Sequence, residues 1–427
     1  MVNETTTVGF VANANNGRGT ISLLSQCLST IFLCVYTALH FDIPVRPLSK
    51  WAVLVRKTIF TMIMAIAPEF IPYNAFNDWY RARLLRTLWN ASISSELSMK
   101  QVHYLLSGGV QISASTEHHD RVLEVELLVF INQVGLAPSH SSKKHPDFQE
   151  FWDTVIAKLP SDRDLDDKSK SDIVGKAITC LQAAKSLVLI IGRLIYGLDI
   201  SLLEVTTAAH IALTLLAYIF WFKKPYNITT YQTVELPFCS DKLSLDRERY
   251  SISTLSTEPT EHLKRRAARE ASPRNLVSSN LYTGSLSEED FYCIGDTRER
   301  RRDDLISLAA LILFCSILGG THIAAWNYQY PSQPEAWLWR ASCLLLGSLP
   351  WYLIYAQFVE HCVKNARQTR AARWHQKINT ICLYILYASY PIARIFLIVE
   401  VFVSLRAAPS GIYQQPDWTT YLGHIGA

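Results

Sequence analysis

Residues 180–197, CLQAAKSLVLIIGRLIYG, are apolar enough to enter a lipid bilayer, yet they include two basic side chains. Lys185 lies near the middle of the stretch, and Arg193 follows a little over two helical turns later. A charge at the centre of a membrane helix costs on the order of 3 kcal/mol. The stretch therefore predicts a membrane helix whose charges are compensated by groups on neighbouring helices.

Apolar runs of similar length recur along the chain. They lie at 21–40, 53–72, 173–196, 202–222, 304–323, 338–358 and 379–404. Most are close to the roughly 20 residues that a helix needs to cross about 30 Å of hydrocarbon. Only 18% of the 427 residues are charged, against about a quarter in soluble domains. We expect an all-α, polytopic helical membrane protein with six or seven transmembrane helices and a small helical cytoplasmic insertion.

The first apolar run is longer than the apolar part of a usual signal peptide, and a single basic residue, Arg18, precedes it. We therefore expect this run to remain as a membrane helix. Most of the nine cysteines lie inside apolar runs, and the sequence contains no CxxC pair. This distribution is typical of small packing residues rather than of a zinc site or a disulfide framework. We predict no metal and no cofactor.

Basic residues gather in two loops, at 223–303 and 364–377. Both loops are predicted to face the cytoplasm, and the first, which is rich in Ser and Thr, is predicted to be largely disordered. The connectors 196–201 and 326–337 lack basic residues and contain aromatic residues of the interfacial kind. The tail at 406–427 is then expected on the non-cytoplasmic side.

The second apolar run allows two topologies. Arg56 and Lys57 lie near its start, while Pro68, Glu69 and Pro72 break its end. If the run crosses the membrane, there are seven spans and the N-terminus lies inside. If it enters and returns, there are six spans and the N-terminus lies outside. We favour seven.

Three N-x-S/T sequons, at Asn3, Asn90 and Asn227, test this topology, because only a lumenal sequon can be glycosylated. With seven spans none of the three faces the lumen.

Residues 73–172 are predicted to form an amphipathic helical insertion. Apolar residues recur at helical spacing in RARLLRTLW, MKQVHYLL and RVLEVELLVFINQVG, and no segment is expected to be a strand. The remaining predicted segments are a disordered N-terminus at 1–20, two hydrophobic helices at 21–72, helices three and four at 173–222, and helices five to seven at 304–405.

The intramembrane charges form a candidate ligand or ion pathway. Eight residues at 100° each put Lys185 and Arg193 about 80° apart around one helix and about 12 Å apart along it, so both can face one internal surface. Other members of this candidate pathway are Glu69, Glu204, Arg394 and Glu400. A plain structural pair explains the same residues, since Arg193 and Glu204 lie near helix ends, where long side chains reach the interface.

His210 and His322 lie in two further apolar runs and complete the candidate pathway. Two histidines on different helices can relay protons, whereas a metal site needs a third ligand at a recognisable spacing.

Two polar stretches resemble known motifs by chance. TEHHDRVLEVE at 116–126 places His118 and His119 side by side, but adjacent residues on a helix point to different sides, so a solvated helix start is favoured. Asp164, Asp166 and Asp167 spell DxDD, which resembles the protonating motif of class II terpene cyclases. Those enzymes hold it in an apolar cavity, whereas here it lies in a hydrophilic linker.

The common catalytic motifs for phosphate, dinucleotide and zinc chemistry are missing from the sequence. Because acids accompany the bases of the 223–303 loop, anionic lipid headgroups are a better partner than nucleic acid. We expect an integral protein of the endoplasmic reticulum or plasma membrane, with an apolar small molecule as a candidate ligand.

Four segments resemble a large group of uncharacterised multi-pass membrane proteins from filamentous fungi and mushrooms. They lie at 67–83, 169–228, 319–345 and 390–425, and include a KKPYN helix exit, a GGTHIAAW element and a tail with PDWTT. The resemblance covers most of the hydrophobic chain and implies no activity. A tryptophan expected in the third run is replaced here by the stretch around Lys185.

Three functional classes fit these observations. A non-enzymatic scaffold, sensor or regulator is favoured by the Ser/Thr-rich loop, which is open to phosphorylation. A transporter or lipid-handling protein is favoured by the buried charges Lys185, Arg193 and Arg394. A membrane-bound biosynthetic enzyme for an isoprenoid-like substrate, as in fungal secondary metabolism, is the third class. We rank the classes in this order.

Overall fold

The computed structural model describes residues 7–12, 18–43, 49–93, 95–116, 119–127, 148–226, 228, 230–235, 297–365 and 370–414. Its long helices are α1 (Thr20–Ala38), α2 (Lys50–Ile66), α3 (Phe70–Ser92), α8 (Lys170–Ile195), α9 (Leu202–Phe220), α14 (Thr297–Ile323), α15 (Gln333–Asn365) and α16 (Arg370–Val403). The 3-10 turns are η2 (Trp221–Lys223), η3 (Ser404–Ala407) and η4 (Ser410–Tyr413).

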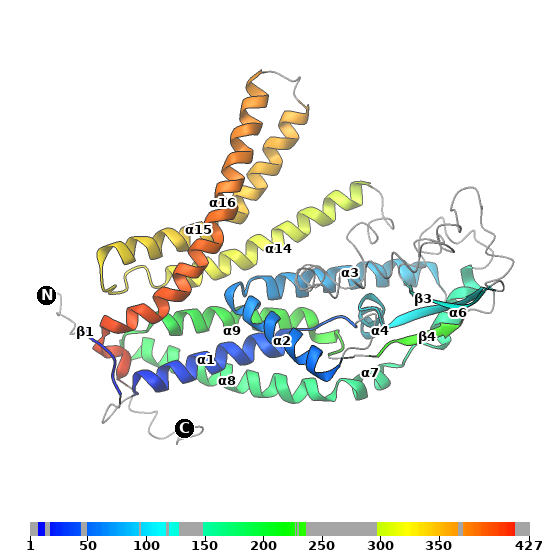
Figure 1. Ribbon diagram of the computed structural model, residues 1–427, viewed down its shortest axis with the longest axis horizontal. Coiled ribbons are helices and arrows are strands. Elements are labelled where there is room, and N and C mark those ends of the chain that lie inside the picture. The colour runs from blue at the N-terminus through cyan, green and yellow to red at the C-terminus, as the bar shows by residue number, and fades with distance from the viewer. Residues whose placement is uncertain are drawn as a thin grey trace.

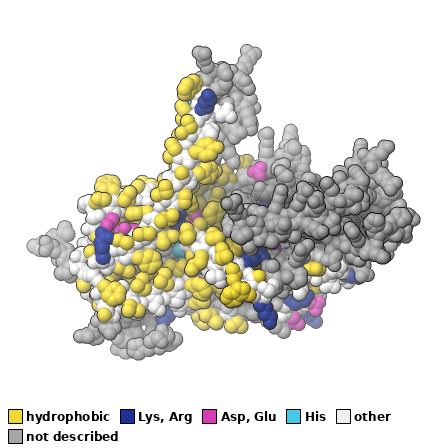
Figure 2. Space-filling view, in the orientation of Figure 1, with side chains coloured by type: hydrophobic (Ala, Val, Ile, Leu, Met, Phe, Trp, Pro, Cys, Tyr) yellow, Lys and Arg dark blue, Asp and Glu magenta, His cyan; other side chains and the backbone are white. Residues whose placement is uncertain are grey.

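Within the described residues, five helices are long and apolar enough to cross a membrane. These stretches are Thr20–Ala38, Val174–Ile195, Leu202–Lys223, Arg302–Ile323 and Trp374–Ala407, and the bent pair α2–α3 is a sixth candidate. Figure 2 shows hydrophobic side chains over most of the visible face of the bundle, as expected of a surface that meets lipid. The structure therefore supports a helical membrane protein with five or six candidate spans.

Small polar residues join the central helices. Thr30 of α1 lies 3.0 Å from Ser186 of α8, and Thr37 of α1 lies 3.0 Å from Thr179 of α8. The hydroxyl of Thr37 also lies 2.5 Å from that of Tyr218 on α9. Hydrogen bonds of this kind hold membrane helices together where no hydrophobic force between helices is available. They show that α1 runs antiparallel to α8 and parallel to α9.

The helices α2 and α3 form a bent pair, either a broken span or a re-entrant loop, which we call the re-entrant pair. They meet at an angle of 110° across a break of a few residues around Pro68, a residue that cannot donate a helical hydrogen bond. The Ser49 hydroxyl caps the start of α2 by accepting a hydrogen bond from the Ala52 amide. The run at 53–72 therefore bends sharply at its proline-rich end.

Both ends of the described chain lie at the same end of the bundle. Strand β1 (Thr7–Val8) pairs antiparallel with β5 (Ala408–Pro409), and Figure 1 shows β1 at the opposite end of the bundle from β3 and α6. We call the end with β1 and β5 the terminal end and the other the module end. The described chain offers five candidate spans, or six with the bent pair α2–α3, against the six or seven expected. The strand at Thr7–Val8 also corrects the expected disorder of residues 1–20.

The module end carries a small mixed module of helices and strands. Its elements are α4 (Met99–Leu106), β2 (Val110–Thr116), β3 (His119–Glu126), α6 (Phe148–Ala157), α7 (Asp162–Lys168) and β4 (Gln232–Glu235). The strands form one sheet in the order β3-β2-β4, with β2 antiparallel to β3 and parallel to β4. The expectation of an entirely helical insertion was wrong, because VQISAST alternates apolar and polar residues as a strand does. The stretch with His119 is likewise the start of β3 and not of a helix.

The module has a core of its own. The rings of Trp89 on α3 and Trp152 on α6 are 4.1 Å apart between centroids, and both side chains are fully buried. Gly109 is required between α4 and β2, because a Cβ there would lie 2.5 Å from the carbonyl oxygen of Tyr104. The C-terminal half of α3 thus leaves the bundle and becomes part of the module.

Helices α15 and α16 form a hairpin that projects from the bundle. Figure 1 shows α15 changing direction part-way along, and Pro350 lies inside this helix. Its first half packs closely on α14, where a Cβ on Gly319 would lie 3.0 Å from the Cα of Gly347. Residues 236–296, most of the loop expected to be disordered, lie outside the described residues.

Candidate functional site

The tip of the re-entrant pair lies in the middle of the bundle. His210 Nε2 on α9 contacts the Ala65 carbonyl at the end of α2, at 3.1 Å. Because α9 begins at Leu202 and rises 1.5 Å per residue, His210 lies about 12 Å from the terminal end. Irregular backbone at this depth is tolerated only where protein or a polar cavity surrounds it.

Arg394 of α16 provides hydrogen-bond donors to the free carbonyl at the broken end of α2. Its Nε donates a hydrogen bond of 2.7 Å to the Ile66 carbonyl, and its Nη2 donates a second to the same oxygen. The last carbonyls of a helix carry partial negative charge, so a guanidinium stabilises them. Arg394 is 2% exposed, so it needs compensation for its own charge.

Glu69 lies on the other side of the break and immediately precedes α3. Its side chain is completely buried, and neither carboxylate oxygen has a partner of proper hydrogen-bond geometry among the described residues; the backbone amide of Glu69 itself is the one nearby donor to the carboxylate. Arg394 and the thiol of Cys315 on α14 lie within electrostatic range, but neither donates a hydrogen bond to it. A buried carboxylate is normally hydrogen-bonded. Glu69 is an exception, which a purely structural role does not explain.

Thr206 stands between the two intramembrane histidines. Its carbonyl lies 2.8 Å from His210 Nδ1, and its hydroxyl lies 3.5 Å from His322 Nε2 on α14. Both ring nitrogens of His210 therefore face carbonyl oxygens, which only accept. Both contacts are hydrogen bonds only when the ring carries two protons. Sequence reasoning missed Thr206, although its position four residues before His210 places it on the same face of α9.

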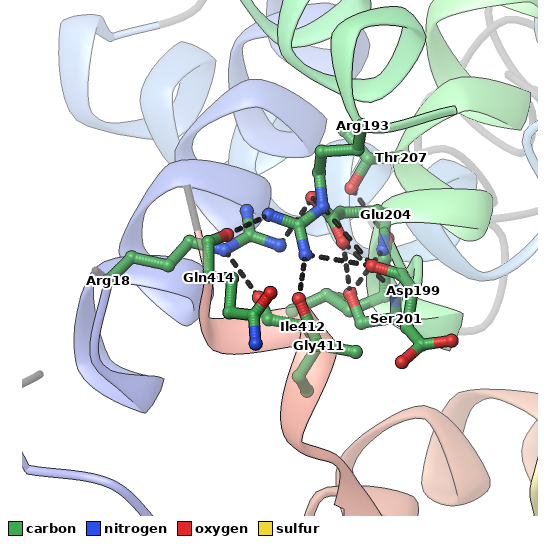
Figure 3. Close-up of polar contacts among 10 residues, drawn as sticks. Arg18, Arg193, Asp199, Ser201, Glu204, Thr207, Gly411, Ile412 and Gln414 are labelled. Atoms are coloured by element: carbon green, nitrogen blue, oxygen red, sulfur yellow. Dashed lines mark hydrogen bonds and ion pairs between the residues drawn. The ribbon is translucent and has the colours of Figure 1, made fainter. Parts of the chain in front are cut away.

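A second buried polar cluster closes the terminal end (Figure 3). Arg193 donates to the carbonyl of Asp199 through Nε and Nη2, to Gln414 through Nη1 at 2.7 Å, and to Gly411 through Nη2 at 2.7 Å. Four of its five N–H donors are thus engaged by two loops that follow α8 and α16. A Cβ on Gly411 would lie 2.3 Å from a carboxylate oxygen of Asp199, so that side chain would have to move.

Glu204 supplies the negative charge of this cluster, which we call the terminal clamp. Its Oε1 lies 2.6 Å from Arg18 Nη2 and 3.7 Å from Arg193 Nε, while its Oε2 accepts two hydrogen bonds from Ser201. Arg18 Nε also donates to the Ile412 carbonyl at 2.9 Å. The clamp therefore ties the chain segments at both ends to α8 and α9. Arg18 was not predicted, because only the fold brings it here.

A family comparison covers most of the chain. A family of unknown function (DUF8562) matches residues 2–124, 151–261 and 290–425. The chain belongs to this family. The family description assigns no activity. No curated protein matches the chain, and no solved structure matches it either.

The segments matched by the DUF8562 family contain every buried charge of the tip and the clamp. They also contain Lys185, whose predicted inward orientation was wrong. Lys185 is exposed on α8, whereas the buried face of that helix carries Ala183, Ser186 and Arg193. One residue of offset turns a helical side chain by about 100°, which moves Lys185 away from that face.

Glu400 lies apart from the tip. It is buried on α16 near the terminal end, and the charges within its electrostatic range are Glu335 and Arg406. The eight predicted pathway residues thus divide: Glu69, His210, His322 and Arg394 gather around the tip, Arg193 and Glu204 form the clamp, Glu400 lies near the terminal end, and Lys185 is exposed.

The DxDD residues of this DUF8562 protein lie on the exposed helix α7. Asp164 caps the start of that helix through Ser161, whose hydrogen bonds lower the pKa of the carboxyl. Asp166 pairs with Lys100 at 2.5 Å. Asp164 thus caps its own helix and Asp166 joins α7 to α4, on an exposed surface and not in an apolar cavity.

A third buried cation sits where α9 meets the module. Lys224 lies 2.9 Å from Asp42 and 2.7 Å from Asp78, and Asp78 also accepts a hydrogen bond from the Trp221 indole. Burial alone lowers the pKa of an ammonium group, but the two carboxylates outweigh it and raise the pKa of Lys224 above its ordinary value. Carboxylates thus neutralise this buried cation, as Glu204 does for the arginines of the clamp.

Proposed function

We propose that this protein moves protons across a membrane, and that Glu69 is the group that takes up and releases the proton. The observation that carries the proposal is the position of Glu69. It is a fully buried carboxylate at the tip of a re-entrant pair, and neither of its oxygens has a well-placed donor among the described residues.

A carboxylate without well-placed donors is costly to keep ionised in the membrane, where desolvation amounts to several kcal/mol. A carboxylic acid avoids most of this cost, so proton uptake is the simplest change that this site favours. Arg394 stands close enough to stabilise the ionised form when the proton leaves. The two states of Glu69 are therefore both accessible, which a proton carrier requires.

Broken helices whose ends meet near the middle of a bundle are the usual framework of transport sites. The backbone at the tip is held by Arg394 and His210, so Glu69 itself is not needed to cap it. Because Glu69 has no capping task at the tip, the transporter class is favoured over a scaffold or regulator. The buried charges of a scaffold need only stabilise the fold, as those of the clamp do. The proposal also includes a fungal origin, a location in the endoplasmic reticulum or plasma membrane, and contacts with anionic lipid headgroups.

Proton flux into proteoliposomes tests the function. The purified chain is reconstituted with a trapped pH dye, and a potassium gradient with valinomycin sets an inside-negative potential. We expect acidification faster than in empty liposomes, and we expect Glu69→Gln to reduce it to the empty-liposome rate.

Lys185→Leu is the matched control, because it removes another intramembrane charge from the exposed face of α8. This variant should fold, insert and conduct protons like the unchanged chain. If the unchanged chain acidifies liposomes no faster than empty ones, or if Glu69→Gln conducts normally, the proposal is wrong.

A further inference from the structure

The terminal end of the bundle holds another buried carboxylate, Glu400, in the last turn of α16. Its side chain is 3% exposed, and its Oε1 has no hydrogen-bond partner among the described residues. Glu335, in the first turn of α15, lies within its electrostatic range. The Oε2 atom of Glu335 is also buried and has no hydrogen-bond partner among the described residues. Figure 1 shows the start of α15 and the end of α16 at the terminal end.

A third such oxygen belongs to Tyr328, in the connector between α14 and α15. Its hydroxyl is buried and makes no hydrogen bond within the described part of the chain. Burial raises the pKa of the Tyr328 and Tyr330 phenols, and the charge of Glu400 is among those that raise each pKa further. Glu400 therefore lies close to both phenols. A buried polar atom without a partner costs about 1–3 kcal/mol, so three of them in one region indicate a ligand that supplies donors.

Aromatic rings lie beside these oxygens. Val401, the neighbour of Glu400, belongs to the same buried cluster as Trp339. Tyr328 and Tyr330 pack against this cluster, and their rings lie 5.3 Å apart. The rings of Tyr330 and Trp339 lie 5.9 Å apart. Because the faces of Tyr and Trp rings attract organic cations, the rings and the carboxylates favour the same kind of ligand.

The two glutamates carry more charge than their cation balances. Arg406, which is half exposed, pairs with Oε1 of Glu335 and lies within electrostatic range of Glu400. Two carboxylates and one guanidinium leave one negative charge uncompensated among the described residues. A ligand with a single positive charge would balance it.

The other charges near the region have partners of their own. In the clamp, Glu204 pairs with Arg18, and both Asp199 and Glu204 act on Arg193, so two acids face two arginines. Arg340 of α15 donates a hydrogen bond of 3.1 Å to a backbone carbonyl of the connector. Neither the clamp nor Arg340 therefore neutralises the two glutamates.

We infer that Glu335, Glu400 and Tyr328 bind a primary organic ammonium ion at the terminal end. An alkylammonium group carries one positive charge and three N–H donors, which match the uncompensated charge and the three unpartnered oxygens. The rings of Tyr330 and Trp339 would contact its hydrocarbon part. A metal ion fits less well, because no set of three His, Cys, Asp or Glu side chains within the described residues is arranged to hold one. This inference goes beyond the proposed function and does not depend on it, since the proton carrier at the tip takes no part in the site.

Equilibrium binding of radiolabelled 2-phenylethylammonium to the purified full chain in detergent tests the inference. We expect saturable binding that unlabelled 2-phenylethylammonium displaces. Tetramethylammonium has the same charge but no N–H donor, so it should not compete. Na⁺ and Ca²⁺ at matched ionic strength should not compete either, because the site lacks a third carboxylate or imidazole ligand.

Substitutions locate the binding site. Glu400→Gln should weaken binding at least about tenfold, because a hydrogen bond to a charged group is lost together with the charge. Tyr328→Phe removes one neutral hydroxyl and should weaken binding about threefold. Glu96→Gln is the matched control, because it makes the same chemical change at an exposed residue of the module, and it should leave the affinity unchanged.

Arg406→Gln should strengthen binding about threefold, because it removes a competing cation from an exposed pair with Glu335. Misfolding cannot produce such a gain. The inference is overturned if binding is not saturable, or if tetramethylammonium, Na⁺ or Ca²⁺ competes equally well. An unchanged affinity in both Glu400→Gln and Arg406→Gln overturns it too, because the ammonium ion would then bind elsewhere. Proton flux through Glu69 is measured separately, so each proposal can fail without the other.

Discussion

The terminal clamp and the re-entrant tip both bury charged groups in one helical bundle, but they treat them differently. In the clamp, Glu204 is surrounded by Arg18, Arg193 and the amide and hydroxyl of Ser201. At the tip, Glu69 has no well-placed donor among the described residues. Burial alone therefore does not mark a functional group. A buried charge that lacks hydrogen-bond partners is better evidence of a functional group, because a purely structural charge normally has them.

The strongest test of this contrast removes the charge of Glu204. Glu204→Gln leaves two buried guanidinium groups without a carboxylate, and we expect it to lower the unfolding free energy by about 3–5 kcal/mol. Thermal unfolding in detergent measures the loss, and hydrogen exchange should rise at residues 7–12 and 404–414.

Glu335→Gln is the matched control for this prediction. Glu335 pairs with Arg406, which is half exposed, and such a pair contributes about 0–1 kcal/mol. If Glu204→Gln is no more harmful than Glu335→Gln, the clamp does not hold the chain ends.

A buried histidine in the module extends the comparison beyond the helical bundle. His103 is 1% exposed and its Nε2 lacks a hydrogen-bond partner among the described residues. Burial lowers the pKa of His103 from 6.5 to about 3, helped by the charge of Lys224. Between these two values the unfolded chain binds a proton and the folded module does not, so the module loses stability as the pH falls.

The expected loss between pH 7 and pH 5 is about 2 kcal/mol, at 1.36 kcal/mol per pH unit below 6.5. Hydrogen exchange of the amides of α4, corrected for its intrinsic pH dependence, measures this loss. His103→Leu should remove most of the pH dependence, and an equal slope in that variant would show that another group causes it.

Glu69→Gln should have a much smaller effect on stability than Glu204→Gln. The substitution removes a charge that lacks well-placed donors, while Arg394 keeps its hydrogen bonds to the Ile66 carbonyl. We expect the unfolding free energy to change by less than about 1 kcal/mol, measured in the same detergent. A loss as large as that of Glu204→Gln would mean that Glu69 is a structural group.

Glycosylation of the three sequons reports which end of the bundle faces the lumen and involves no change in stability. If the basic loop that follows α9 faces the cytoplasm, the terminal end, which carries β1, lies outside. Asn3 lies outside the described residues. In eukaryotic membranes we expect a glycosidase-sensitive gel shift that Asn3→Gln abolishes and Asn90→Gln does not. A glycan on Asn90 or Asn227 would reverse the orientation.

Much of the membrane architecture could be predicted because apolar runs of about 20 residues dictate it. The break at Pro68 and the partnership of Arg193 with Glu204 were also visible in the sequence. The inward orientation of Lys185 was wrong because an error of one residue moves a side chain to another face of the helix.

Other features depend on contacts between distant segments. Strand β4 comes from Gln232–Glu235, about a hundred residues after β2, so its pairing cannot be read from local pattern. Arg18 and Gly411 acquire their roles only where the two ends of the chain meet. The depth of the tip likewise follows from its contact with His210 and not from any local signal.

Carbodiimide labelling of the purified protein tests the central claim most directly, because it compares Glu69 with Glu204 in one sample. Dicyclohexylcarbodiimide enters membranes and reacts only with a protonated carboxyl group. We expect Glu69 to be labelled, faster at acidic pH, and Glu204 to stay unlabelled, because Arg18, Arg193 and Ser201 engage its oxygens. Labelling of Glu204 with Glu69 untouched would contradict the account.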